Sequence, residues 1–323
     1  QPVIADGNAE SKVRQGVTLD VIGESQTVAP LEGPVLEEYR SEHRKRNMIE
    51  TDWSTFSGYF ARLIKQGVSI NVASGVSPQQ IKRVVVGFKE RPATAPEQLQ
   101  MNERVGLAME EGALGLTCAW HAGGPEYPHE VVEMAKVARS YGGYYGVHLG
   151  SEGFDIMEEL EKAIRVGRHA GIPVHIYHLK MRAKSNWGRV RQVVAQIEEA
   201  RRDGLDVTAN QYPYTAMQHP WRRLFPRWVQ NAPLSEMLPQ FRSAEFRARV
   251  LADAEFQQYV NEHGGWEGIV GARFDTPELK PFEGKTIAEI AEIRGKDPAA
   301  TCFDLIFAEG GFIHGVHHTM CED

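Results

Sequence analysis

Two histidines at the ends of neighbouring predicted strands are the residues best suited to chemistry. The runs Gly143–His148 and Pro173–His178 each end in histidine. Side chains alternate along a strand, so we expect each histidine to share a face with the residues two and four positions before it. Neutral imidazole is a common zinc ligand, and two from adjacent strands can share one ion. The pattern alone leaves open that both are ordinary strand-end histidines.

The elements that must position these histidines alternate regularly along the chain. Amphipathic helical stretches separate six short strand-like runs, and glycine closes three of the helices, at Gly112, Gly171 and Gly204, as helix ends often require. Strand, helix, strand at this spacing indicates parallel β/α units, and six in a row favour a TIM-type barrel. The predicted strands are Val17–Ile22, Ser69–Ala73, Ala113–Cys118, Gly143–His148, Pro173–His178 and Asp206–Asn210.

A barrel would bring the two histidines together at its C-terminal mouth, where such folds place their active sites. The pattern changes after Tyr214, where prolines crowd a short span and a helical region follows. We therefore predict a barrel core over residues 1–217 and a mainly helical excursion over 218–323, with weaker strands near 268–272 and 312–317.

Composition excludes several classes of function. The net charge of -7 does not favour binding to nucleic acid. The three cysteines are far apart, which argues against a disulfide scaffold and for a reducing, cytoplasmic compartment. No apolar run reaches the roughly 20 residues of a membrane-spanning helix.

Seven motifs in order resemble the D-aminoacylase (N-acyl-D-amino-acid deacylase) branch of the metal-dependent amidohydrolases. Each motif is moderately specific, and together they cover nearly the whole chain. They are SKVRQGVT (11–18), EGALGLT (111–117), YGGYYGVHLGSEG (141–153), IPVHIYHLK (172–180), NWGRV (186–190), LDVTANQYPYTA (205–216) and GKTIAEIAEIRGKDPAAT (284–301).

The resemblance implies a zinc site with one or two ions, in which His148 and His178 are ligands. It implies that Lys180 and Tyr212 hold the carboxylate of an N-acyl-D-amino acid while the amide bond is cleaved. A surface charge at Lys180 and rim packing at Tyr212 are the alternatives. A related dipeptidase or cyclic-amide hydrolase, or a catalytically degenerate barrel that only binds, stays open as a function, and an oligomer is possible.

The chain departs from this family at both ends. The family begins its barrel with His-x-His and has a proton-accepting aspartate on the last strand, and we expect these before Gln1 and after Asp323. The fold class expected is thus an incomplete (β/α)8 barrel of the amidohydrolase superfamily, with strands two to seven present and one and eight missing. Little or no hydrolysis is expected from these 323 residues alone.

Other departures surround the predicted site. Many relatives have a bridging cysteine where this chain has Gly23-Glu24-Ser25, and Glu24 could supply a carboxylate ligand instead. Cys118 is better explained as a small core thiol than as a ligand. Many members of the family carry Arg at the position of Gly150, and they usually have Asp at that of Asn210.

Three further histidines are weaker candidates for the site. His121, on a loop at the barrel mouth, is a candidate substrate contact. His317 and His318 are adjacent in a predicted strand, so their side chains should point to opposite faces and not share an ion.

Overall fold

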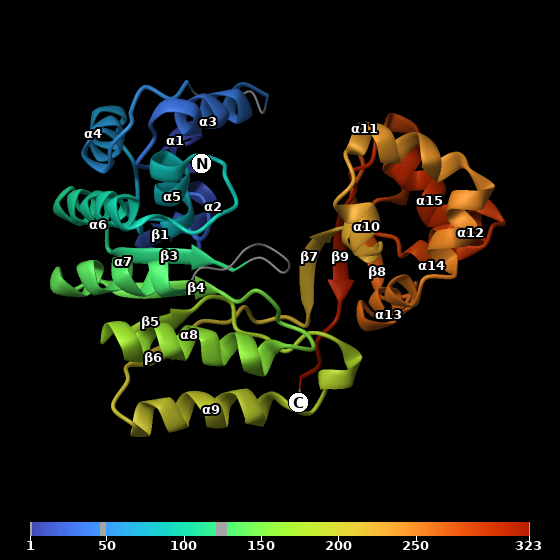
Figure 1. Cartoon of the computed structure of the whole chain (residues 1–323). Coiled ribbons are helices and arrows are strands. Elements are labelled where there is room, and N and C mark those ends of the chain that lie inside the picture. Colours follow the sequence, from blue (N-terminus) through green and yellow to red (C-terminus); the bar gives the residue numbers. More distant parts are fainter. Residues whose placement is uncertain (1, 46–49, 121–127, 323) are drawn as a thin grey trace. The chain divides into compact units, whose positions relative to one another are not determined.

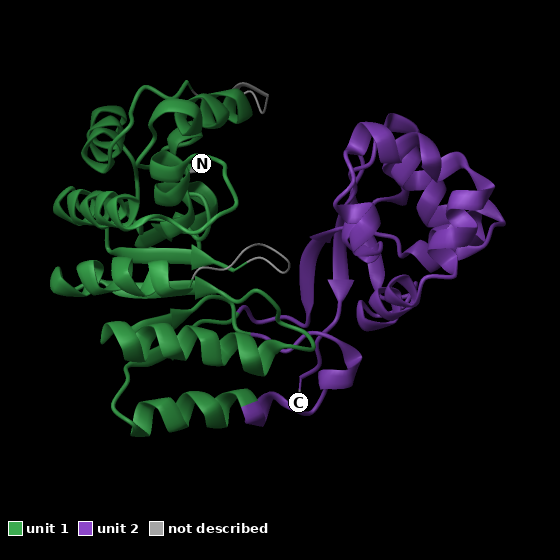
Figure 2. Cartoon of the chain, viewed as in Figure 1, with its two compact units in different colours: residues 1–179, 193–211 green, residues 180–192, 212–323 purple. Residues whose placement is uncertain are grey.

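The computed structural model describes residues 2–45, 50–120 and 128–322. The chain divides into two compact units, coloured separately in Figure 2. Unit 1 contains residues 1–179 and 193–211, and unit 2 contains residues 180–192 and 212–323. The structure places the boundary between residues 211 and 212, six residues before the predicted boundary between 217 and 218. It also places the segment 180–192 in unit 2.

Unit 1 contains all six predicted strands, and they run parallel in chain order (Figure 1). β1 pairs with β2, and β3 to β6 form a four-stranded sheet. A parallel bridge between Val76 and Leu116 connects the end of β2 to β3. The strands are β1 (Leu19–Ile22), β2 (Asn71–Ser74), β3 (Gly115–Ala119), β4 (Tyr144–His148), β5 (Val174–Ile176) and β6 (Val207–Ala209).

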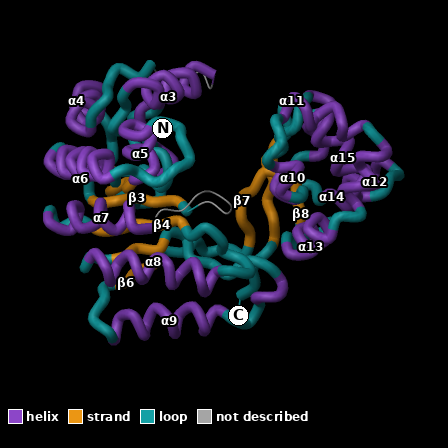
Figure 3. Tube along the Cα trace, in the orientation of Figure 1, coloured by secondary structure: helices purple, strands orange, loops and turns teal. Residues whose placement is uncertain are grey.

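Helices separate these strands, as Figure 3 shows by colour, so the predicted α/β fold with parallel strands is confirmed. The helices up to β6 are α1 (Pro2–Ala5), α2 (Glu10–Val13), α3 (Gly33–Lys45), α4 (Phe56–Gln66), α5 (Pro78–Val86), α6 (Ala95–Glu110), α7 (Pro128–Ser140), α8 (Ile156–Ala170) and α9 (Val190–Arg202). Helices α1 to α8 lie in unit 1, and α9 is divided between the units after residue 192.

Local chemistry explains where these helices begin and end. Thr94 and Glu97 form a reciprocal capping box at the start of α6, which satisfies two backbone N–H groups. α8 ends at Gly171, whose φ of 64° is the left-handed conformation that glycine adopts without a Cβ clash. Gly112 and Gly204 also have positive φ, which confirms the predicted helix ends.

Unit 2 is built on a three-stranded antiparallel sheet with the order β7-β9-β8. The weaker strands predicted near 268–272 and 312–317 are present as β8 (Ile269–Arg273) and β9 (His314–His318). β7 (Ala216–Pro220) was not predicted, because its sequence AMQHP has no clear alternation and ends in proline. The short helices of this unit are η1 (Lys184–Asn186), η2 (Trp221–Leu224), α10 (Arg227–Gln230), α11 (Leu234–Met237), η3 (Leu238–Arg242), α12 (Ala244–Leu251), α13 (Ala254–Glu262), η4 (Pro277–Phe282), α14 (Ile287–Arg294) and α15 (Pro298–Ala308).

Aromatic side chains fill the core of unit 2. The ring centroid of Phe225 lies 5.1 Å from that of Phe241 and 5.4 Å from those of Phe256 and Phe303. All four side chains are fully buried. None of the helices in the described ranges is long and apolar enough to span a membrane.

Candidate metal centre

His148 is the last residue of β4, and the strand register decides which way its side chain points. Tyr144, Gly146 and His148 alternate onto one face of the sheet, which we call the histidine face. A Cβ placed on Gly146 would lie 2.2 Å from the hydroxyl oxygen of Tyr177, so Tyr177 of the next strand segment lies on the same face. The alternation predicted for β4 is therefore correct.

β5 differs from its prediction. The strand ends at Ile176, and the register pairs Val174 and Ile176 with residues of β4 that face the helices. Val174 packs so closely against α8 that a Cβ on Gly167 would lie 2.4 Å from its methyl group. The prediction that Val174, Ile176 and His178 share one face is therefore wrong.

His178 reaches the histidine face through a turn rather than through alternation. Its φ of 37° is left-handed, a conformation that few residues other than glycine adopt. This turn redirects a side chain that regular alternation would have sent toward the helices. The backbone N–H of His178 donates to Oδ1 of Asn210, which follows β6, and this bond holds the turn in place.

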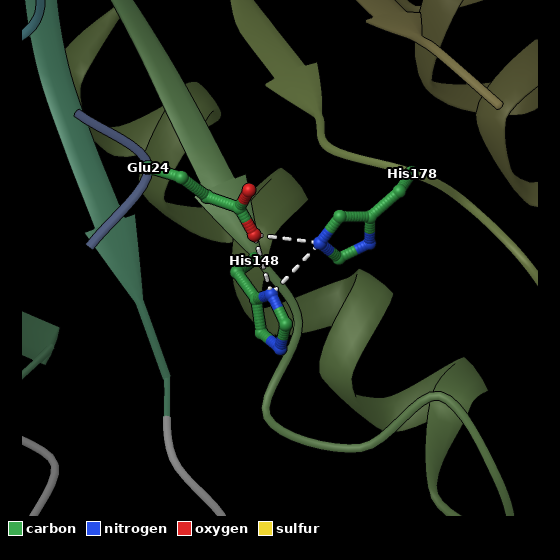
Figure 4. Close-up of side chains that lie close together, drawn as sticks. All are labelled: Glu24, His148 and His178. Atoms are coloured by element: carbon green, nitrogen blue, oxygen red, sulfur yellow. Dashed lines mark hydrogen bonds and ion pairs between the residues drawn. The ribbon is translucent and has the colours of Figure 1, made fainter. Parts of the chain in front are cut away.

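Glu24 follows β1 and completes a cluster with the two histidines (Figure 4). Its Oε1 lies 2.8 Å from Nδ1 of His148 and 2.6 Å from Nε2 of His178. The two ring nitrogens lie 2.9 Å apart. Among the described residues, this is the one group of three His, Cys, Asp or Glu side chains whose ligand atoms lie within 4.8 Å of one another.

The donor set suits zinc. Two imidazole nitrogens and one carboxylate oxygen are ordinary zinc ligands, and a site with three protein ligands has a position left for water or substrate. Hydrogen bonds from His148 and His178 hold the pKa of Glu24 well below its usual range, so its carboxylate is charged at neutral pH. The three side chains therefore fit a divalent cation in both chemistry and charge.

Glu152 is a member of the site that the sequence did not indicate. It is 8% exposed, and its Oε1 lies 2.9 Å from Nδ1 of His178. It lies four residues after His148, in a segment where no spacing rule marks a partner for a histidine on another strand. A cavity of about 560 Å³ lies beside the cluster and is lined by Glu24, His178 and Asn210 among others.

The predicted substrate residues Lys180 and Tyr212 contact each other within unit 2. Nζ of Lys180 lies 5.4 Å from the centroid of the Tyr212 ring, and Tyr212 stacks on Tyr214 at 4.4 Å. Lys180 is only 6% exposed, which excludes the alternative of a surface charge. The Lys180 ammonium group therefore faces an aromatic ring rather than bulk water, which is a costly place for a charge unless other groups stabilise it.

The remaining predicted residues have varied outcomes. His121 lies outside the described residues. Cys118 is fully buried, and Nε2 of Gln79 lies 2.9 Å from its sulfur, as a core thiol would have it. On β9, His317 is buried and His318 is exposed, which confirms that they face opposite ways.

Two curated proteins of Alcaligenes xylosoxydans xylosoxydans are similar to part of this chain. D-aminoacylase of Alcaligenes xylosoxydans xylosoxydans is 29% identical over 208 residues, which are 62% of this chain and 40% of that protein. The N-acyl-D-glutamate deacylase of the same organism is 30% identical over 158 residues, or 48% of this chain and 32% of that protein. The chain is thus a partial match to proteins named D-aminoacylase and N-acyl-D-glutamate deacylase. It spans less than half the length of these relatives, and no family model matches it.

Solved structures of a D-aminoacylase and of an N-acyl-D-glutamate deacylase share the fold of this chain. A D-aminoacylase crystal structure, described as defining a novel subset of amidohydrolases, aligns with a TM-score of 0.66 at 23% identity. An N-acyl-D-glutamate deacylase from Bordetella bronchiseptica, complexed with zinc and a phosphonate inhibitor, aligns with a TM-score of 0.69 at 21% identity. Each alignment covers 99% of this chain and 58% of the other.

Proposed function

We propose that this protein is a zinc-dependent hydrolase that cleaves the amide bond of N-acyl-D-amino acids. The observation that carries the proposal is the convergence of Glu24, His148 and His178 from three separate segments onto one point. The partial homologues named D-aminoacylase and N-acyl-D-glutamate deacylase support the substrate class. The zinc in a solved N-acyl-D-glutamate deacylase supports the choice of metal.

The chain's own residues would share the work as follows. Glu24, His148 and His178 hold the cation, and the charged carboxylate of Glu24 offsets part of its charge. A zinc ion held by them supplies Lewis-acid polarisation of the amide carbonyl and activation of water. The proton-accepting aspartate expected after Asp323 stays a prediction.

We propose that Lys180 and Tyr212 bind the carboxylate of the substrate. The contact between the Lys180 ammonium and the Tyr212 ring supports this, because it holds a cation and a phenol close together. A carboxylate binds well to a charged donor and a hydroxyl donor that are already in place.

We also propose that β1 to β6 correspond to strands two to seven of a TIM-type barrel. Their parallel order and the helices between them support this, as does the likeness to solved amidohydrolases. The cluster would then lie at the C-terminal end of the strands, because His148 ends β4 and Glu24 follows β1.

Zinc titration of the 323-residue chain tests the centre directly. We expect one tight site that is lost in both His148→Ala and His178→Ala, with the fold retained by circular dichroism. Hydrolysis of matched N-acyl-D- and N-acyl-L-amino acids, by protein purified from its natural source, tests the substrate class. Zinc binding that is unchanged in both variants, or turnover that survives complete metal removal, would overturn the proposal.

A further inference from the structure

Glu152 holds His178 from the side opposite to the proposed metal. Its Oε1 lies 2.9 Å from Nδ1 of His178, while Nε2 of the same ring faces Glu24 at 2.6 Å. An ionised carboxylate accepts hydrogen bonds and cannot donate them, so without a cation both ring nitrogens of His178 face an acceptor. When a cation takes the lone pair of Nε2, the remaining ring proton is on Nδ1, where Glu152 accepts it.

The segment that carries Glu152 is fixed by its own contacts. Leu149 and Ile156, on either side of it, are 2% and 1% exposed. The backbone N–H of Gly150 donates to Oε2 of Glu159 at 3.2 Å, and a Cβ on Gly150 would lie 2.8 Å from that oxygen. Glycine at 150 thus leaves room for Glu159 to hold this loop.

The backbone of His178 makes an external support necessary. Its left-handed φ is an unfavourable conformation for a side chain with a Cβ, and such residues persist where their surroundings hold them. Asn210 holds the N–H of His178, and Glu152 holds its ring. The position of Nε2 therefore depends on a loop that begins at the other histidine, His148.

We propose that Glu152 is a positioning residue of the centre, whose carboxylate fixes the ring orientation and tautomer of His178 so that Nε2 receives the cation. This rests on the proposed function. Metal-bound histidines commonly donate their second N–H to a carboxylate, and loss of that partner typically weakens metal binding by about 10- to 100-fold. Burial of Glu152 strengthens the contact, because little water competes for the carboxylate.

The test compares Glu152→Gln and Glu152→Ala with the matched control Glu130→Gln. Glu130 is also a buried carboxylate, 2% exposed, and it pairs with Lys82 rather than with a histidine. We expect chelator-competition titration to give a zinc dissociation constant raised about tenfold in Glu152→Gln and about 100-fold in Glu152→Ala. The control should stay within about threefold of the wild type.

A second measurement reports on the contact itself. Ring ¹H and ¹⁵N chemical shifts of His178 in the metal-free wild type should report a hydrogen-bonded proton on Nδ1, and this hydrogen-bonded signal should be lost in Glu152→Ala. An Nδ1 that carries no proton in the wild type would overturn the inference, as would Glu152 variants that bind zinc like the control. A wild type that binds no zinc at all would instead overturn the proposed function, while the chemical shifts of Nδ1 would still test the contact.

Discussion

His148 and His178 turn different ring nitrogens toward each other: Nδ1 of His148 lies 2.9 Å from Nε2 of His178. Both nitrogens also lie within 2.8 Å of the same Oε1 of Glu24. The two rings are tilted by 81° and so approach that oxygen from different directions. The two histidines are therefore not equivalent, and changes around them should have separable effects.

Replacement of Glu24 tests whether its carboxylate is a ligand of the proposed metal centre. Glu24→Gln removes the charge but keeps the size, and we expect zinc affinity to fall by at least about tenfold. Glu24→Cys should retain zinc binding, because a thiolate is also a zinc ligand. Competition titration at constant pH measures both. Equal affinity of wild type and Glu24→Gln would remove Glu24 from the centre.

Asn210 should contribute to stability through the His178 backbone. Asn210→Ala leaves that N–H without its side-chain partner, and we expect a loss of about 1 kcal/mol in the free energy of unfolding. Asn210→Asp keeps an acceptor and should stay near the wild type. Urea unfolding at neutral pH checks both, and a fully stable Asn210→Ala would contradict the role given to this bond.

Acid should destabilise unit 2 through its buried histidines. Burial lowers the pKa of His317 to about 4 and of His263 to about 3, while the value in an unfolded chain is 6.5. Below pH 6.5 these histidines bind protons in the unfolded chain but stay neutral in the folded protein. The free energy of unfolding therefore falls as the pH drops from 6.5 toward 4. The loss approaches about 1.4 kcal/mol per pH unit for each histidine. His219 and Arg182 face this pair.

The measurement is the free energy of unfolding at intervals between pH 7 and pH 5. His317→Gln should have a shallower dependence on pH than the wild type. His169, an exposed histidine of α8, provides a matched control in His169→Gln. An identical slope in wild type and His317→Gln would show that this histidine is not the source.

Gly167 should tolerate no side chain, because α8 packs closely against Val174 of β5 there. A Cβ would lie 2.4 Å from a methyl group of Val174 and 3.1 Å from Leu205. We expect Gly167→Ala to lower stability by about 1 to 3 kcal/mol despite its better helix propensity. Gly106→Ala in α6 is the control, since its Cβ would meet Tyr141 only at 3.4 Å. The thermal unfolding midpoints of the two variants should shift from the wild type in different directions or by clearly different amounts.

Lys180→Met keeps the length of the side chain and removes its charge. If Lys180 binds the substrate carboxylate, kcat/KM of the active protein should fall by about 10- to 100-fold, as expected for loss of a charge-assisted hydrogen bond. Zinc affinity should be unchanged, which separates this effect from damage to the centre. A variant with normal kcat/KM would return Lys180 to a structural role.

The sequence was informative where one local rule decides the structure. Six strands and three glycine helix ends follow from alternation and turn chemistry, and the face of His148 follows from simple strand periodicity. His178 broke that periodicity, because a single left-handed residue after β5 reverses the direction of its side chain. A single sequence contains no pattern that predicts a left-handed backbone conformation at a residue other than glycine.

Contacts between distant segments were beyond sequence reasoning for a different reason. Glu152 supports a histidine on another strand, and the identity of its partner depends on how a loop packs. The prediction of Glu24 as a ligand rests on the family resemblance alone, because nothing in its spacing from the two histidines indicates a contact. β7 was missed because its pairing with β9 supplies an order that AMQHP does not encode locally.

The order of the proposed ligands along the chain has a thermodynamic consequence. Glu24 and His148 are 124 positions apart, and His148 and His178 are 30 apart. A cation bound to all three would act as a removable cross-link that closes two long loops and ties β1 to β4 and β5. Because the entropy cost of closing a loop grows with its length, such a link restricts the unfolded chain strongly. Metal supply would then set how firmly the first strand is held, as well as whether the site can act.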